Sequence, residues 1–218
     1  MERTLGNARL GMDRVDHLVY SSPDLTAGIN AIEALTGIRA ATGGSHPGMG
    51  TRNALLSLGS RTYLEIIAPD PAQTEFRRPR VFQIDQLSAP RLVTWAAKSA
   101  DIAEIAGKML PGGGSIGSPM PGSRQTANGA TISWQLTDPF AEIANGIVPF
   151  FIDWGNTPHP AADAPGTATL VSLHARHPEA DYVRSVCTAL GIDISVRKGP
   201  QASLVAIIDT PRGRVELS

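Results

Sequence analysis

The spacing of hydrophobic positions changes along the chain in an order that recurs. A strand-length apolar run, Val15–Tyr20, is followed by apolar residues at helical spacing from Leu25 to Leu35, and Gly37 ends this pattern. Two further apolar runs, Arg52–Leu58 and Thr62–Ile67, are separated by three turn-forming residues and predict a β-hairpin. The first 70 residues therefore predict strand, helix and then at least two strands.

The same order returns twice. In residues 90–156 a strand and a helix, the latter from Asp101 to Leu110, precede two more strands, and a proline-rich loop is expected over Ser118–Arg124. In residues 168–218 a strand, a helix and three short strands follow one another. Thr157–Thr167 is rich in Pro and Ala and is predicted to be a linker.

These repeats predict an α+β fold built from βαβββ units, at a spacing of about 75 residues. Units 13–70 and 90–156 are expected to pair around a cavity, and 168–218 is a third, similar unit. A unit of this kind buries its sheet only against another unit, so the unpaired third one predicts a homodimer.

Composition restricts the partners. Of the 218 residues 42% are hydrophobic, the formal net charge is −1, and there is one cysteine, Cys187. The absence of a long basic run argues against nucleic acid as a partner, and no apolar stretch is long enough to cross a bilayer. Because there is no signal-peptide pattern and no disulfide pair, we expect a soluble, cytoplasmic protein that acts on a small molecule.

Glu65 is the residue that breaks the hydrophobic pattern most sharply. It lies between Leu64 and Ile66 in a strand whose neighbours are apolar, where a carboxylate is costly unless a cation, such as a metal, an arginine or a substrate group, lies beside it. His17 lies in the apolar strand Val15–Tyr20. We expect both side chains to face one cavity, although a core histidine and a salt-bridged glutamate remain the simpler alternatives.

A glycine-rich stretch precedes the hairpin and contains His46, with Arg52 and Asn53 just after it. Glycine favours turns, so a loop is predicted here. Arg52, Asn53 and, on the later proline-rich loop, Arg124 are candidates to hold an anionic or carbonyl group. Trp95, Trp134 and Trp154 lie on predicted second-unit strands and either wall an apolar pocket or pack in the core.

The segments DHLVY, GGSHPGMGTRNALLSLG, YLEIIAPD and PFFIDWG resemble the glyoxalase-like domain family of the vicinal oxygen chelate superfamily. This resemblance implies two paired βαβββ units around an open cavity, with metal ligands from the first and fourth strands of each unit. It implies that His17 and Glu65 are ligands and that Asp153 lies near the second carboxylate. Thr94 and Trp95 stand where a second histidine would fall.

Two functions compete on this basis. In the first, a divalent ion (Zn, Ni, Mn or Fe) at His17, Glu65 and Asp153 chelates an oxygen-rich or anionic substrate, and Glu65 moves a proton in a lyase, isomerase or dioxygenase type of reaction. In the second, the same cavity binds or sequesters a small molecule without a metal. In both, the predicted ligand contacts are His46, Arg52, Asn53, Trp95, Arg124 and Trp154.

Overall fold

The structure is a computed structural model and describes residues 12–77, 79–126 and 129–218. The first unit consists of β1 (Val15–Ser21), α2 (Leu25–Thr36), β2 (Ala41–His46), β3 (Thr51–Gly59) and β4 (Thr62–Pro69). The second consists of η1 (Ile84–Gln86), β5 (Arg91–Lys98), α3 (Ile102–Ala106), β6 (Met120–Thr126), β7 (Thr131–Leu136), η2 (Ile143–Gly146) and β8 (Phe150–Asp153). The third consists of η3 (Pro160–Ala162), β9 (Thr169–His177), α4 (Ala180–Ala189), β10 (Ser195–Lys198), β11 (Ser203–Thr210) and β12 (Gly213–Leu217).

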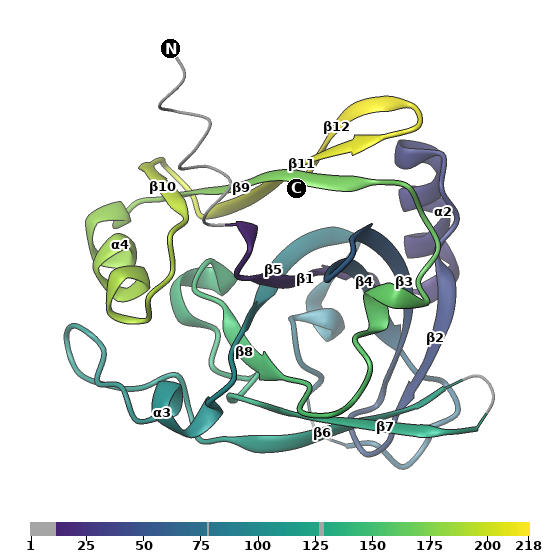
Figure 1. Ribbon diagram of the computed structural model, residues 1–218, viewed down its shortest axis with the longest axis horizontal. Coiled ribbons are helices and arrows are strands. Elements are labelled where there is room, and N and C mark those ends of the chain that lie inside the picture. Colours follow the sequence, from purple (N-terminus) through teal and green to yellow (C-terminus); the bar gives the residue numbers. More distant parts are fainter. Residues whose placement is uncertain (1–11, 78, 127–128) are drawn as a thin grey trace.

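The first two units close into one barrel with the strand order β1-β4-β3-β2-β6-β7-β8-β5 (Figure 1). Within each unit the first and last strands are parallel neighbours, β1 with β4 and β5 with β8. Between the units, β1 pairs with β5 and β2 pairs with β6, both antiparallel. The α+β fold with two paired βαβββ units is confirmed.

Helix α2 covers the outside of the barrel and has the ends that its sequence predicts. The Asp24 side chain accepts a hydrogen bond from the Ala27 N–H at 2.8 Å, and Gly37 ends the helix in the left-handed conformation (φ 77°). Ile29 and Ile32 are buried in the main hydrophobic core. Gly28 allows close packing on β4, since a Cβ there would overlap Ile66.

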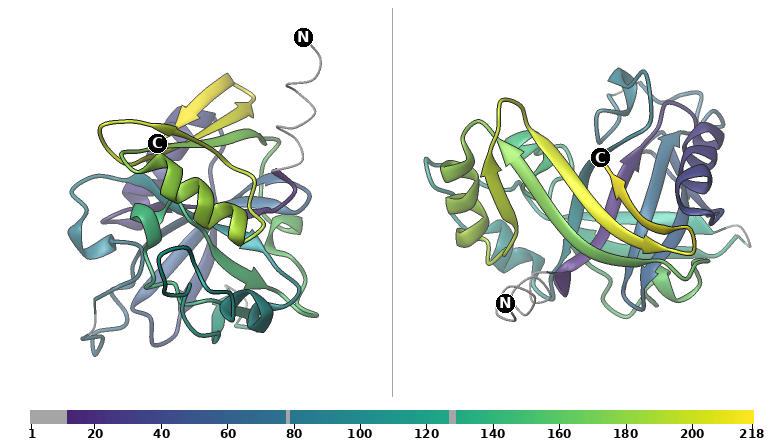
Figure 2. Two further views of the ribbon diagram at one scale, coloured as in Figure 1. Left: turned by 90° about the vertical axis from the view of Figure 1, so that its left-hand side faces the viewer. Right: turned by 90° about the horizontal axis from the view of Figure 1, so that it is seen from above.

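The third unit keeps the order of elements but pairs its strands differently. Its sheet has the order β10-β9-β11-β12, with β9 parallel to β10. The sheet runs across the outside of the barrel, with α4 near one end and α2 near the other (Figure 2). A single hydrophobic core joins Leu18 and Leu64 of the barrel to Leu173 and Ala206 of this sheet. The third unit thus finds its partner surface within the same chain, and the homodimer stays a prediction.

Four local expectations differ from the structure. The first half of the glycine-rich stretch belongs to strand β2, and only residues 47–50 form a turn. The proline-rich stretch that holds Arg124 is β6 rather than a loop. The helix predicted from Asp101 to Leu110 is shorter, since α3 ends at Ala106, and Met109 beyond it is 75% exposed. The predicted linker packs on the barrel: Ala161 is buried, and the Ser57 N–H donates to the Pro165 carbonyl at 2.8 Å. Within the described residues, no helix has the length and apolar character needed to span a membrane.

Candidate functional site

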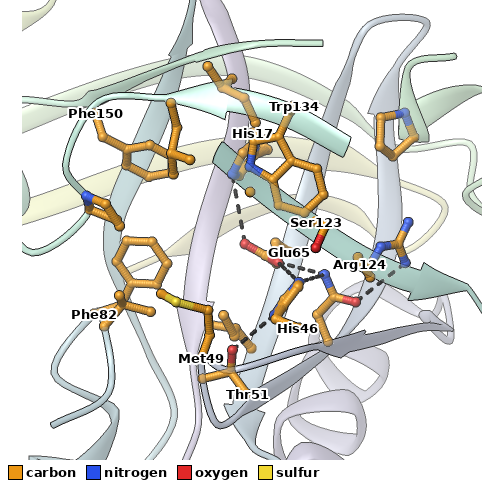
Figure 3. Close-up of a pocket in the computed structure, with 18 of the residues that line it drawn as sticks. His17, His46, Met49, Thr51, Glu65, Phe82, Ser123, Arg124, Trp134 and Phe150 are labelled. Carbon is orange, nitrogen blue, oxygen red and sulfur yellow. Dashed lines mark hydrogen bonds and ion pairs between the residues drawn. The ribbon is translucent and has the colours of Figure 1, made fainter. Parts of the chain in front are cut away.

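A cavity of about 150 Å³ lies inside the barrel, and its polar wall comes from five consecutive strands (Figure 3). Each of β1, β4, β3, β2 and β6 contributes at least one polar side chain to that wall, and the site is built from one of each: His17, Glu65, Asn53, His46 and Arg124. All five residues are buried. They are five of the nine site residues that the sequence predicts, and Trp154, a sixth, also lines the cavity.

The strand register brings His17 and Glu65 together. His17 lies opposite Tyr63 on the parallel neighbour β4, and Glu65 is two residues further along β4, so both side chains point to the same face. The Nε2 atom of His17 is 3.7 Å from Oε2 of Glu65, and the imidazole stacks on the Tyr63 ring with centroids 4.6 Å apart. The two residues face one cavity, as predicted.

The Glu65 carboxylate lies between two imidazoles, with one oxygen toward each. Its Oε1 atom is 3.7 Å from Nε2 of His46 and accepts a hydrogen bond from Nδ2 of Asn53 at 2.6 Å. No arginine or lysine among the described residues forms an ion pair with it. The simpler alternative for Glu65, a salt bridge to an arginine or lysine, is therefore not found among the described residues.

His46 is held as a neutral ring. Burial lowers its pKa, partly offset by the charge of Glu65, and the charge of Arg124 lowers it further. Asn53 Nδ2 lies 3.3 Å from Nε2, where an amide donor requires an acceptor lone pair, and Nδ1 lies 2.9 Å from Oγ1 of Thr51. The lone pair on Nε2 therefore points toward Glu65 and the cavity.

Asp16 contacts His17 on the ring nitrogen that faces away from Glu65. A β-bulge between Val15 and His17 lets neighbouring side chains reach the same region, and Asp16 is 1% exposed. Its carboxylate oxygens lie 2.8 Å from Nδ1 of His17 and 3.1 Å from Nε2 of His159, and they accept from Nε1 of Trp154 at 3.2 and 3.3 Å. Burial by itself would raise the pKa of Asp16, but the hydrogen bonds from His159 and His17 hold it far below its usual range. With Nδ1 of His17 against this carboxylate, Nε2 is the ring nitrogen that faces Glu65.

Arg124 reaches the site across the glycines of β2. Its Nη1 donates to Oδ1 of Asn53 at 3.4 Å, and none of the described carboxylates lies within ion-pairing distance. A Cβ on Gly43 would overlap both Asn53 Oδ1 and Arg124 Nη1, and one on Gly44 would overlap the Gln125 carbonyl of β6. The glycines are thus needed for close approach, and they keep a buried cation beside the cavity.

The remaining three strands form an apolar wall. Trp134 and Leu136 of β7 and Phe150 and Ile152 of β8 line the cavity, and Val93 and Ala96 of β5 join them in the same apolar cluster. Phe82, from the segment before η1, stacks on Phe150 with centroids 5.4 Å apart. The second unit therefore supplies apolar surface at the positions where the first supplies His17 and Glu65.

Three predicted site residues lie away from the cavity, because strand neighbours point to opposite faces. Arg52 is next to the inward-facing Asn53 and lies on the outer side, where its charge helps to lower the pKa of Asp70. Trp95 packs in the core under the third sheet and donates from Nε1 to the Ile147 carbonyl at 2.9 Å. Asp153 lies between the cavity-lining Ile152 and Trp154, and its Oδ1 accepts from the Gly155 N–H.

Sequence reasoning missed Asp16, Tyr63, Phe82, Phe150 and His159. Alternation from Glu65 would have placed Tyr63 on the same face of β4. No local signal marks Asp16 or His159, because their contact depends on a bulge and on a segment that folds back from 143 residues away in sequence.

The donor arrangement does not fit the metal site that the family resemblance implies. Zinc-type ions need ligand atoms about 2.0–2.2 Å from one point. Here the two oxygens of Glu65 face different histidines, so the carboxylate separates the imidazoles instead of joining them at one centre. Across the described ranges, no group of three or more His, Cys, Asp or Glu side chains could hold a metal ion. Strands β7 and β8 of the second unit add only apolar and aromatic side chains to the cavity, and Arg124 of β6 already supplies a positive charge.

Among the similar solved structures, the first supports the fold. A crystal structure of a hypothetical protein from Staphylococcus aureus matches with a TM-score of 0.59 and 14% identity, over 93% of this chain and 83% of that one. Methylmalonyl-CoA epimerase from Mycobacterium tuberculosis matches with a TM-score of 0.39 and 17% identity, over 65% of this chain and 88% of that one. A variant of the Streptomyces coelicolor methylmalonyl-CoA epimerase, in complex with 2-nitronate-propionyl-CoA, matches with a TM-score of 0.41 and 16% identity, over 67% of this chain and 98% of that one.

No curated protein matches this chain in sequence. The sequence profile described as "Glyoxalase-like domain" matches residues 15–191, from β1 through α4. The match covers both barrel units and continues into the third, beyond the region in which the motifs themselves resemble the family. The chain belongs to the glyoxalase-like domain family.

Proposed function

We propose that this protein binds a small carboxylate that carries an acidic C–H beside a carbonyl group, and that Glu65 moves the proton of that C–H. The observation that carries the proposal is the Glu65 carboxylate between two imidazoles, in a cavity that also holds the cation of Arg124, which has no ion-pair partner among the described carboxylates. This combination offers a base, a proton-accepting neighbour and an anion contact within one wall.

Each polar residue has a task in this proposal. Arg124 and the amide of Asn53 bind the carboxylate or the carbonyl oxygen of the ligand and stabilise negative charge that develops on it. Glu65 accepts the proton from carbon, and the Nε2 atoms of His17 and His46 lie 3.7 Å from its two oxygens, close to where that proton is held. The apolar wall excludes water, which strengthens these interactions. Such proton transfer is the first step of an isomerase or lyase type of reaction.

A metal site at His17, Glu65 and Asp153 is the form that the family resemblance favours, but the arrangement of donors supports a metal-independent site. The second candidate function is a binding or sequestering protein without turnover. It is favoured by the 2.6 Å hydrogen bond from Asn53 to Glu65, which occupies one oxygen of the proposed base.

The test is exchange of carbon-bound hydrogen in D₂O. Pyruvate and 2-oxobutanoate would be incubated with the protein, and deuterium incorporation would be followed by ¹H NMR. We expect exchange above the protein-free rate, a loss of about 10²- to 10⁴-fold in Glu65→Gln with binding retained, and weaker binding in Arg124→Gln. Asp153→Asn, a change of carboxylate outside the cavity, is the control. Binding without exchange would support the second candidate, and equal exchange in wild type and Glu65→Gln would refute the assignment of Glu65.

A further inference from the structure

The side of the cavity opposite Arg124 is built from aromatic and flexible apolar side chains. Phe82 and Phe150 stack with an interplanar angle of 28°, and Met49 and Met120 line the same cavity. Figure 3 shows Phe82, Phe150 and Met49 on one side of the cavity, with Glu65 between them and Arg124. A ligand that spans the cavity therefore needs one charged end and one apolar end.

The size of the cavity limits the apolar end. A cavity of about 150 Å³ lined by apolar side chains is large enough to hold benzene. Aromatic walls favour a flat ring, because stacked or edge-to-face contact between rings adds binding free energy to that gained by burying their surface. Trp134 adds a further ring, and it lies edge-on to His46 with centroids 6.2 Å apart.

The backbone around Phe82 is held in a costly conformation. Phe82 and Gln83 have φ values of 59° and 56°, in the left-handed region that side chains other than glycine rarely adopt. A glycine at position 82 would relieve this strain but would remove the ring from the cavity wall. Strain of this kind persists where it serves a site, which favours a role for the Phe82 ring in contacting a ligand.

We propose that the ligand is an aromatic carboxylate with a single six-membered ring one or two carbons from the acid group. The ring lies against Phe82 and Phe150, and the carboxylate binds Arg124. This inference rests on the proposed function for the head group and adds the apolar class of the ligand.

The test compares three probes by isothermal titration calorimetry: 3-phenylpropanoate, propanoate and 3-phenylpropanamide. Burial of a phenyl group predicts that 3-phenylpropanoate binds about ten- to a hundredfold more tightly than propanoate. It is also expected to bind more tightly than the uncharged amide. Trp134 and Trp154 line the cavity, so fluorescence quenching gives a second readout of the same binding.

Variants separate the two ends of the ligand. Phe150→Leu and, as a second variant with a milder effect on packing, Phe82→Leu are expected to weaken 3-phenylpropanoate several-fold and leave propanoate unchanged. Arg124→Gln is expected to weaken both acids. Phe140→Leu, the same substitution at a 42% exposed position, is the control and is expected to change neither.

The outcomes distinguish this inference from the proposed function. If propanoate binds as tightly as 3-phenylpropanoate, with both dependent on Arg124, the aromatic class is refuted while the carboxylate site stands. If the aromatic amide binds as tightly as the acid and Arg124→Gln has no effect, the head-group assignment fails and with it the proposed function. If none of the three probes binds, both are refuted.

Discussion

Asp16→Asn tests whether the acid behind His17 organises the site. Asp16 is almost fully buried and accepts hydrogen bonds from His17, His159 and Trp154. Asparagine has nearly the same shape, but it keeps one acceptor oxygen and replaces the other by an NH₂ donor. At least one of the two histidine N–H groups then faces a donor, and His17 can regain a partner only by changing its tautomer.

The expected loss of folding stability in Asp16→Asn follows from the contacts with these three residues. A hydrogen bond to a charged acceptor contributes about 1.5–3 kcal/mol, and a neutral one contributes about 1 kcal/mol. The substitution weakens the retained contacts, leaves one donor unsatisfied, and recovers part of the cost of burying the charge. We expect a net loss of about 3 kcal/mol. In a chain of this size that corresponds to a fall in Tm of about 6–12 °C.

The assay is thermal and urea unfolding at pH 7, together with ¹⁵N NMR of the histidine rings. Glu65→Gln is the matched control, since Glu65 is also a buried carboxylate but accepts a hydrogen bond only from Asn53, and its loss of stability should be below about 1 kcal/mol. The NMR spectrum should show Nδ1 of His17 protonated in the wild type and a changed tautomer in Asp16→Asn. Equal stability of the two variants, with the His17 tautomer unchanged, would refute the reasoning.

Four further outcomes are expected. Because burial lowers the pKa of His46 in the folded protein, the unfolded chain takes up a proton at a higher pH, and the free energy of unfolding should fall as the pH falls through the ordinary histidine value of 6.5. His46→Gln should make the free energy of unfolding less dependent on pH in this range, and an unchanged dependence would contradict the reasoning. Burial raises the pKa of the Cys187 thiol to about 11, so a thiol reagent at pH 8 should label it only in denaturant, and rapid labelling of the folded protein would contradict this. Mn²⁺, Ni²⁺ or Zn²⁺ added after chelator dialysis should leave Tm unchanged, whereas a rise that His17→Ala abolishes would restore the metal site. Gly43→Ala should weaken carboxylate binding as Arg124→Gln does, because its Cβ would displace the guanidinium; unchanged binding in calorimetry would show that the guanidinium is not needed.

The parts of the fold and site that could be predicted are those fixed by local pattern. The helical spacing of Leu25–Leu35 predicted α2, and the apolar neighbours of Glu65 marked it as a carboxylate in a buried strand. Adjacent candidates could also have been separated by strand alternation, since Arg52 and Asn53 on one strand cannot both face the cavity. Where one element determines the direction of a side chain, the sequence was sufficient.

The parts that could not be predicted depend on contacts between distant segments. Gly43 and Gly44 favour a loop when taken alone, but in the barrel they form a strand that another strand and the Arg124 side chain cross closely. Asp16 faces the site because of a bulge in the pairing of β1 with β5, and pairing irregularities leave no mark in a single sequence. His159 comes from a proline-rich segment whose composition is that of a linker.

The difference between the two barrel units bears directly on the chemistry. Two units related as repeats could each provide a histidine and a carboxylate, and the four groups together would surround an ion. In this chain the first unit has polar side chains at such positions, whereas β5 and β8 of the second provide Val93, Ala96, Phe150 and Ile152. A carboxylate with hydrogen-bond partners on one side and hydrocarbon on the other is suited to accept a proton from a bound ligand, because the apolar wall keeps competing water away from it. The lack of metal-binding side chains at these positions of β5 and β8 thus removes half of the ligands for a metal and creates the surface on which an apolar ligand can lie beside Glu65.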